Sequence, residues 1–120
     1  MEVVLSLGSN YGDRAGSLKA AIDWVSGILS NCLISSIYET DAIGGGSPYM
    51  NAVVKGEWQG SAEELNIKCK EYERTNGRTP EARMLKRVPI DIDVVVAAGT
   101  VLRERDFRCA YFKRGINELV

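Results

Sequence analysis

The sequence contains no histidine, and this absence excludes several kinds of chemistry. Catalysis by Ser-His-Asp or Cys-His groups is excluded, because both depend on an imidazole base. The commonest neutral metal ligand is missing as well. Any metal must therefore be held by carboxylates, which favour a hard cation such as magnesium.

Cysteine and long apolar runs are also scarce. Cys32, Cys69 and Cys109 are isolated and odd in number, which predicts reduced thiols and no disulfide framework. No apolar run approaches the roughly 20 residues that a membrane helix needs. The first residues are acidic and lack the basic start of a signal peptide. We therefore expect a cytoplasmic protein without a membrane partner.

Length and composition are typical of one globular domain. The chain has 120 residues, 45% hydrophobic and 26% charged, so a single domain over residues 1–120 is expected. Between positions 74 and 114 there are ten basic and five acidic side chains. In a chain of net charge −1, this stretch favours a compact anion such as a nucleotide over nucleic acid. An ordinary solvated surface is an equally good explanation.

The hydrophobic pattern predicts an α+β fold. Asp13 is a typical helix N-cap, and Ser61 with Glu64 forms the pattern of a capping box. Segment 79–88 is polar and irregular, and 106–113 is expected to form a further strand or an extended arm. The order β-α-β-β-α-β predicts a ferredoxin-like two-layer α/β sandwich with an antiparallel sheet. The expected strands are 2–7, 32–39, 50–58 and 90–98, and the expected helices are 14–29 and 61–75.

Asp91 and Asp93 form the most distinctive local pattern. Residues two apart on a strand point to the same face, so both carboxylates lie together just before the apolar run 94–96. A divalent cation would relieve their repulsion and their loss of solvation. The alternative is a solvated strand end, because Asp-x-Asp alone is a common pattern.

A basic segment precedes this pair. Its cations are Arg78, Arg83, Lys86 and Arg87. Phosphoryl transfer requires cations that neutralise charge on phosphate oxygens, and a flexible loop can close over a substrate. An ordinary solvated loop is the more common explanation of such a pattern.

Tyr49 and Asn51 are expected to share one face of a strand. An aromatic ring beside an amide suits a flat heterocycle, although an edge tyrosine and a hydrogen-bonded asparagine are the more common explanation of such a pattern. Gly8-Ser9-Asn10 matches neither a P-loop nor a dinucleotide fingerprint, and a tight turn accounts for it locally.

Five segments occur in a characteristic order between residues 3 and 102. They are Leu7-Gly8-Ser9-Asn10-x-Gly12-Asp13-Arg14, Tyr38-Glu39-Thr40, Tyr49-Met50-Asn51-Ala52-Val53-Val54, Glu73-x-x-x-Gly77-Arg78 and Ile90-Asp91-Ile92-Asp93. Together they resemble the 6-hydroxymethyl-7,8-dihydropterin pyrophosphokinase family. That family transfers pyrophosphate from ATP to the hydroxymethyl group of the pterin in folate synthesis, releases AMP and uses two magnesium ions. The resemblance implies the same activity and the same small-molecule partners.

The resemblance also implies roles for individual residues. Asp91 and Asp93 would bind both magnesium ions, and Arg78 and Arg87 would complete the catalytic group. The expected pterin contacts are Thr40, Ile43, Tyr49, Asn51 and Ile116, and the expected ATP contacts are Glu73, Arg78, Arg103 and Arg114.

Several family positions hold other residues in this chain. Leu85 replaces a loop tryptophan and Val88 a loop arginine, with Arg87 one residue away. Arg108-Cys109 stands where the family has His-Tyr, Ile116 replaces the phenylalanine that sandwiches the pterin, and the chain ends sooner than typical members. Two hypotheses remain: a working, shortened pyrophosphokinase, or a catalytically weak or inactive relative that binds nucleotide or pterin or serves as an interaction module. The sequence predicts no oligomeric state.

Overall fold

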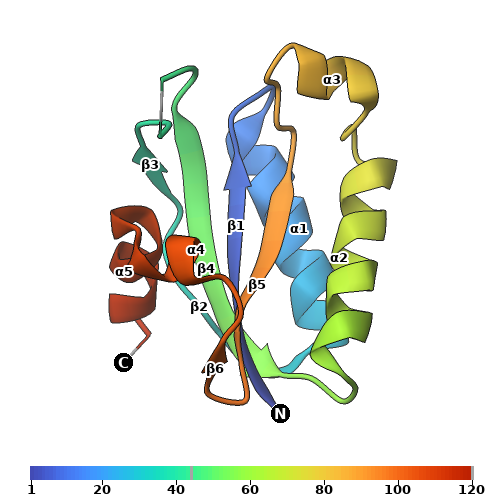
Figure 1. Cartoon of the computed structure of the whole chain (residues 1–120), viewed down its shortest axis with the longest axis vertical. Coiled ribbons are helices and arrows are strands. Elements are labelled where there is room, and N and C mark those ends of the chain that lie inside the picture. The colour runs from blue at the N-terminus through green and yellow to red at the C-terminus, as the bar shows by residue number, and fades with distance from the viewer. Residues whose placement is uncertain (44, 120) are drawn as a thin grey trace.

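An antiparallel sheet organises the computed structural model of the chain, which describes residues 1–43 and 45–119 (Figure 1). Its strands are β1 (Glu2–Ser9), β2 (Ser30–Ile34), β3 (Tyr38–Thr40), β4 (Tyr49–Glu57), β5 (Asp91–Ala97) and β6 (Thr100–Val101). The strand order is β2-β4-β1-β5-β6. β3 also pairs with β4, at residues 49–51, whereas β2 pairs with residues 54–57. The predicted α+β class is confirmed.

Helices lie on both faces of this sheet (Figure 1). Two long helices cover one face, two short C-terminal helices lie against the other, and a one-turn helix stands near one end of the sheet. No helix in the described part of the chain combines the length and the apolarity needed to cross a membrane. The helices are α1 (Arg14–Ile28), α2 (Ala62–Thr75), α3 (Pro80–Met84), α4 (Glu104–Arg108) and α5 (Ala110–Asn117).

The two long helices begin where the sequence predicts. The Asp13 side chain accepts a hydrogen bond from the Gly16 amide at 3.0 Å and caps α1. Ser61 and Glu64 form the complete capping box of α2, which satisfies backbone donors that a helix start leaves unpaired. Gly77 follows α2 with a φ of 103°, a conformation that glycine adopts without a steric penalty.

Alternation along β1 divides the core between the two faces. Val3, Leu5 and Leu7 are fully or almost fully buried in the large cluster beneath α1 and α2. Val4 points the other way and packs in a second cluster with Phe112 of α5, because successive strand residues face opposite sides. Beyond Val4, the second face of β1 carries only small residues, and this leaves room for a cavity.

Three sequence predictions differ from the structure. The expected strand 32–39 is divided into β2 and β3, because the Ser35 hydroxyl accepts a hydrogen bond from the Val53 amide at 2.8 Å in place of a backbone carbonyl. Segment 79–88 contains α3, which the Thr79 side chain caps. The expected strand or arm at 106–113 is wrong, since α4 and α5 occupy it. The three glycines at 44–46 predict a loop over residues 41–48, and Gly44 lies outside the described residues.

Candidate active site

A cavity of about 200 Å³ opens on the face of the sheet that α5 partly covers. Its floor comes from three adjacent strands, and its walls come from the loop after β3 and from α5. Polar and apolar surface contribute similarly to its lining, and the polar share distinguishes it from the two apolar clusters. The lining residues are Ser6, Gly8, Thr40, Asp41, Ile43, Tyr49, Asn51, Asp91, Asp93 and Tyr111.

The register of the sheet brings the amide and one carboxylate to the same level. Gly8 on β1 pairs with Asn51 on β4 and with Asp91 on β5. A Cβ at position 8 would lie 3.3 Å from Tyr49 Cδ2 and 3.4 Å from Asn51 Oδ1, so a side chain there would crowd both neighbours. Gly8 lies inside β1 and not in a turn, and its missing side chain keeps the floor of the cavity open.

Asn51 presents a fixed amide at one end of this row. The residue is buried, and its Nδ2 donates to Thr40 Oγ1 at 2.6 Å. This bond ties β3 to β4 and orients the amide, leaving Oδ1 above Gly8. An oriented amide beside the ring of Tyr49 can bind the edge of a planar heterocycle while the ring provides an apolar face.

Asp91 and Asp93 stand at the other end of the cavity. Burial raises the pKa of Asp93 to about 6, Asp91 adds to the increase through its charge and a hydrogen bond, and Lys70 and Arg103 oppose it. A nearby cation would stabilise the charged form of such a carboxylate. The oxygen donors and the electrostatic cost therefore fit a hard divalent cation. Among the described residues no group of three or more His, Cys, Asp or Glu is placed to hold a metal, so water and phosphate oxygens would complete the coordination.

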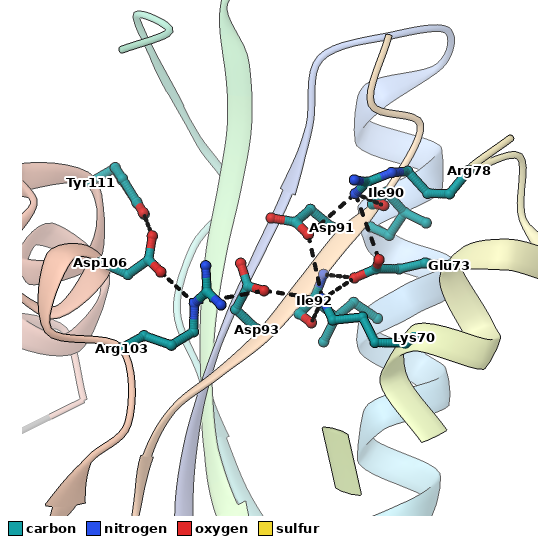
Figure 2. A network of polar contacts seen from close by, with 10 residues as sticks. All are labelled: Lys70, Glu73, Arg78, Ile90, Asp91, Ile92, Asp93, Arg103, Asp106 and Tyr111. Carbon is teal, nitrogen blue, oxygen red and sulfur yellow. Dashed lines mark hydrogen bonds and ion pairs between the residues drawn. The ribbon is translucent and has the colours of Figure 1, made fainter. Parts of the chain in front are cut away.

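Lys70 on α2 lies against this carboxylate pair (Figure 2). Its Nζ is 2.8 Å from Glu73 Oε2, 3.1 Å from Asp93 Oδ1 and 3.8 Å from Asp91 Oδ1. Burial works to lower the pKa of Lys70, but the charge of Asp93 and the hydrogen bond with Glu73 outweigh it and raise the pKa. The lysine therefore remains charged at neutral pH.

Glu73 connects the two cations on the α2 side of the site (Figure 2). It is 5% exposed, and its Oε2 accepts a hydrogen bond from the Ile92 amide at 2.8 Å. Arg78 Nη1 lies 3.6 Å from Glu73 Oε1 and 3.2 Å from Asp91 Oδ1. Glu73 therefore joins α2 to the backbone of β5 and positions Lys70 and Arg78 beside the aspartates.

A third cation approaches from the opposite side. Arg103 Nε lies 3.8 Å from Asp93 Oδ1 and 2.5 Å from Asp106 Oδ2. The other oxygen of Asp106 accepts a hydrogen bond from the Tyr111 hydroxyl. The C-terminal helices thus hold Arg103 at the cavity, in contact with a predicted metal ligand.

Sequence reasoning missed several of these residues. Lys70 precedes Glu73 by three positions, a helical spacing that places two side chains on one face, so it could have been found. Asp106 and Tyr111 gave no such signal, because the tail was expected to be extended. Gly8 was noted only as part of a turn.

Three predicted site residues neither line the cavity nor belong to the ion-pair network around Asp91 and Asp93. Ile116 packs against the apolar cluster of α5 and does not line the cavity, and Tyr111 forms that wall instead. The Arg114 guanidinium lies 4.6 Å from the centroid of the Tyr38 ring. Arg87 likewise lies over an aromatic ring, that of Tyr11, at 4.7 Å.

The basic segment after α2 is anchored through its backbone. The Asn10 amide donates to the Val88 carbonyl at 2.9 Å, and the Val88 amide donates to Asn10 Oδ1 at 2.6 Å. The side chains of Arg83, Lys86 and Arg87 are exposed. The segment is therefore fixed at its end, while its cations face solvent.

Comparison with known proteins decides the family. The family described as 7,8-dihydro-6-hydroxymethylpterin-pyrophosphokinase (HPPK) matches residues 4–118. The chain belongs to the HPPK family. The five segments of the resemblance meet at the cavity, where four contribute lining residues and the segment with Glu73 and Arg78 borders the aspartates.

Individual relatives carry matching names. A 2-amino-4-hydroxy-6-hydroxymethyldihydropteridine pyrophosphokinase of Aquifex aeolicus is 33% identical over 105 residues, covering 86% of this chain and 65% of the relative. A protein of the same name from Porphyromonas gingivalis is 35% identical over 99 residues, covering 78% and 67%. The mitochondrial folate synthesis bifunctional protein of Pisum sativum is 37% identical over 98 residues, covering 78% and 19%. The HPPK-family chain thus spans about two thirds of the first two relatives.

Proposed function

We propose that this chain transfers pyrophosphate from ATP to 6-hydroxymethyl-7,8-dihydropterin, as a 2-amino-4-hydroxy-6-hydroxymethyldihydropteridine diphosphokinase of folate synthesis. One observation carries the proposal: Asn51, Gly8 and Asp91 are paired across three strands. A ring bound by the amide would lie over the glycine, and a substituent on its far edge would reach the carboxylates. Family membership supports the same reaction.

The pterin would occupy the half of the cavity near β3 and β4. Asn51 would hydrogen-bond its edge, Tyr49 would contact its face, and Thr40 and Ile43 would contribute contacts from the adjoining loop. Ile43 is 62% exposed in the free protein, so a bound ring would cover apolar surface there and gain hydrophobic stabilisation.

ATP would bind beside Asp91 and Asp93, which would hold two magnesium ions. The ions, when bound, would neutralise charge on the phosphate oxygens. Arg78 and Arg103 would supply fixed positive charge to the phosphates from either side, and Arg87 would approach from the basic segment. Glu73 would keep Arg78 in place, and Arg114 would reach the phosphates from its place over the Tyr38 ring.

The proposed step exchanges one phosphorus–oxygen bond for another. The hydroxymethyl oxygen of the pterin bonds to the β-phosphorus of ATP, and the bond from that phosphorus to the α,β-bridging oxygen breaks. AMP leaves with the bridging oxygen, and the hydroxyl proton passes to Asp91. The main contribution of the protein is orientation and electrostatic stabilisation.

We also infer that residues 1–120 act as one domain with a ferredoxin-like βαββαβ core. The antiparallel pairing of β1 with β4 and β5, and the placement of α1 and α2 on one face, support this topology. The core would serve as a rigid frame, and the site lies on the face opposite the two long helices.

A catalytically weak relative is the second candidate. Leu85 replaces the family's loop tryptophan and is 60% exposed, and the cations of the same segment face solvent. A pterin or nucleotide would still find Asn51 and the aspartates in place. This candidate predicts binding without efficient turnover.

A direct assay separates the two candidates. The protein is supplied with ATP, magnesium and 6-hydroxymethyl-7,8-dihydropterin, and AMP is measured alongside pterin binding by calorimetry. AMP formation that requires the pterin supports the proposed reaction. Pterin binding without AMP supports the binding module, and absence of both would overturn the assignment of the cavity.

A further inference from the structure

The ammonium group of Lys70 occupies the centre of the acidic part of the site (Figure 2). It contacts the carboxylates of Glu73, Asp91 and Asp93 at 2.8, 3.8 and 3.1 Å. Its Nζ also donates to the Ile92 carbonyl at 3.1 Å. A positive charge that belongs to the chain itself thus lies where the two aspartates are expected to attract divalent cations.

The position of Lys70 is determined by β5 as much as by α2. Ile92 donates its amide hydrogen to Glu73 and accepts a hydrogen bond from Lys70 through its carbonyl. Both partners on α2 are therefore fixed by one residue of β5, which lies between the two aspartates. This arrangement limits the freedom of a side chain that is otherwise long and flexible.

A fixed ammonium has opposite effects on the two components of a magnesium nucleotide. It repels a divalent cation at Asp91 and Asp93, and it attracts the phosphates that would accompany that cation. Both effects act at short range in a partly buried site, where solvent screens charge less than at an open surface. Lys70 should therefore disfavour the free ion more than the ion that arrives together with a nucleotide.

We propose that Lys70 couples divalent-cation binding at Asp91 and Asp93 to the presence of nucleotide. In the free protein its ammonium holds both aspartates and weakens their affinity for an isolated cation. A triphosphate offsets the repulsion, so cation and nucleotide bind with positive coupling. The inference rests on the proposed function, because it takes the two aspartates as cation ligands. It gives Lys70 a positioning and selectivity role and not a catalytic one.

The decisive experiment measures Mn²⁺ binding by electron paramagnetic resonance, with and without a non-hydrolysable ATP analogue. The test variants are Lys70→Met and Lys70→Gln, which remove the charge with little change of length. Lys70→Arg is the charge-preserving control. Lys68→Met is the matched control, because Lys68 is an exposed lysine on the same helix.

We expect both neutral variants to bind Mn²⁺ about tenfold more tightly than the wild type in the absence of nucleotide, since one unit of repulsion at short range is removed. The increase in Mn²⁺ affinity on adding the ATP analogue should shrink by a similar factor, and the reciprocal effect on nucleotide affinity must match it. Lys70→Arg should keep most of the nucleotide dependence, because it preserves the charge but not the shape of the ammonium group. Lys68→Met should behave like the wild type. Damage to the fold would weaken Mn²⁺ binding, so tighter binding distinguishes the proposed role from a structural one.

Two results would overturn the inference in different ways. If the wild type binds Mn²⁺ together with the analogue but the neutral variants show unchanged or weaker Mn²⁺ affinity, the role of Lys70 is wrong and the proposed function is untouched. If no variant binds Mn²⁺ even with the analogue, the aspartates are not cation ligands and both proposals fail. Circular dichroism of each variant identifies any that do not fold, and the second neutral variant then provides the result.

Discussion

Two regions of the proposed site differ in how their cations are paired with carboxylates. Beside β5, Lys70 and Arg78 each lie within 4 Å of two or more carboxylates. In the segment 79–88, Arg83 and Lys86 are exposed, and none of the ion pairs among the described residues includes them. The first region is organised before any ligand binds, whereas the cations of the second face solvent.

The difference has a simple structural origin. Glu73 is buried and bonded to the backbone of β5, so it can hold the cations around it at defined places. The basic segment is fixed through Asn10 and Val88 near its end. These bonds orient the backbone, and of its cations Arg87 packs on the Tyr11 ring while Arg83 and Lys86 are exposed. Organised charge stabilises a transition state without reorganisation during the reaction, so the β5 region should dominate catalysis.

The largest effect is expected from removing both aspartates. Asp91→Asn combined with Asp93→Asn should lower AMP formation by more than about 10³-fold, because the proposed magnesium ions would lose both protein ligands. Steady-state kinetics and Mn²⁺ binding measure the two consequences separately. Glu71→Gln, at an exposed position of α2, is the control. Magnesium-dependent nucleotide binding that survives the double substitution would show that the metal assignment is wrong.

Loss of the fixed arginine should be the next largest effect. Arg78→Ala should reduce kcat/KM by about 10²–10³-fold, because one organised donor is removed from the phosphates. Arg78→Lys should restore part of the loss, since it keeps the charge but not the planar fork. A decrease of less than tenfold in kcat/KM for the alanine variant would contradict the importance of the β5 region.

Glu73 should contribute to stability more than any exposed acid on its helix. Glu73→Ala should lower the free energy of unfolding by about 2 kcal/mol, since the buried Ile92 amide and two cations lose an acceptor. Urea denaturation measures the change, and Glu71→Ala is the matched exposed control, for which a change within about 0.5 kcal/mol is expected. Equal values for the two variants would show that the network adds no stability.

The smallest effect is expected in the basic segment. Arg87→Ala should leave the free energy of unfolding within about 0.5 kcal/mol of the wild type. It should lower kcat by about tenfold, since a solvent-exposed cation stabilises the negative charge of the phosphates less than a partly buried one. Arg83→Ala tests whether the neighbouring cation shares this role. A loss as large as that for Arg78→Ala would mean that the segment closes over the substrate and that the two regions are equivalent in the bound state.

Local patterns predicted most of the fold. The caps at Asp13 and Ser61 gave the starts of α1 and α2, and apolar periodicity gave β1, β4 and β5 within one or two residues. The tail escaped prediction because its helices depend on tertiary contacts. Phe112 is buried against the sheet, and a Cβ on Gly115 would approach Val53 Cγ2 too closely. Glycine at position 115 therefore allows α5 to pack directly on the second face of the sheet.

The site was predictable in pieces. Asp91 with Asp93, and Tyr49 with Asn51, are pairs within one strand, and the period of two places each pair on one face. Their meeting across Gly8 requires the register of three strands. The family resemblance indicated that the two pairs belong to one site, but it gave no geometric reason for their meeting.

The sequence by itself determined β1, β4, β5, the long helices and the family, because these depend on neighbours along the chain and on ordered motifs. The tertiary structure decided which charges meet. Lys70 and Arg103 reach Asp93 from α2 and from the approach to α4, and the separation of these residues in sequence gives no measure of their distance in space. Electrostatic interaction depends on that distance and on burial, and both arise only when the sheet, α2 and the C-terminal helices assemble.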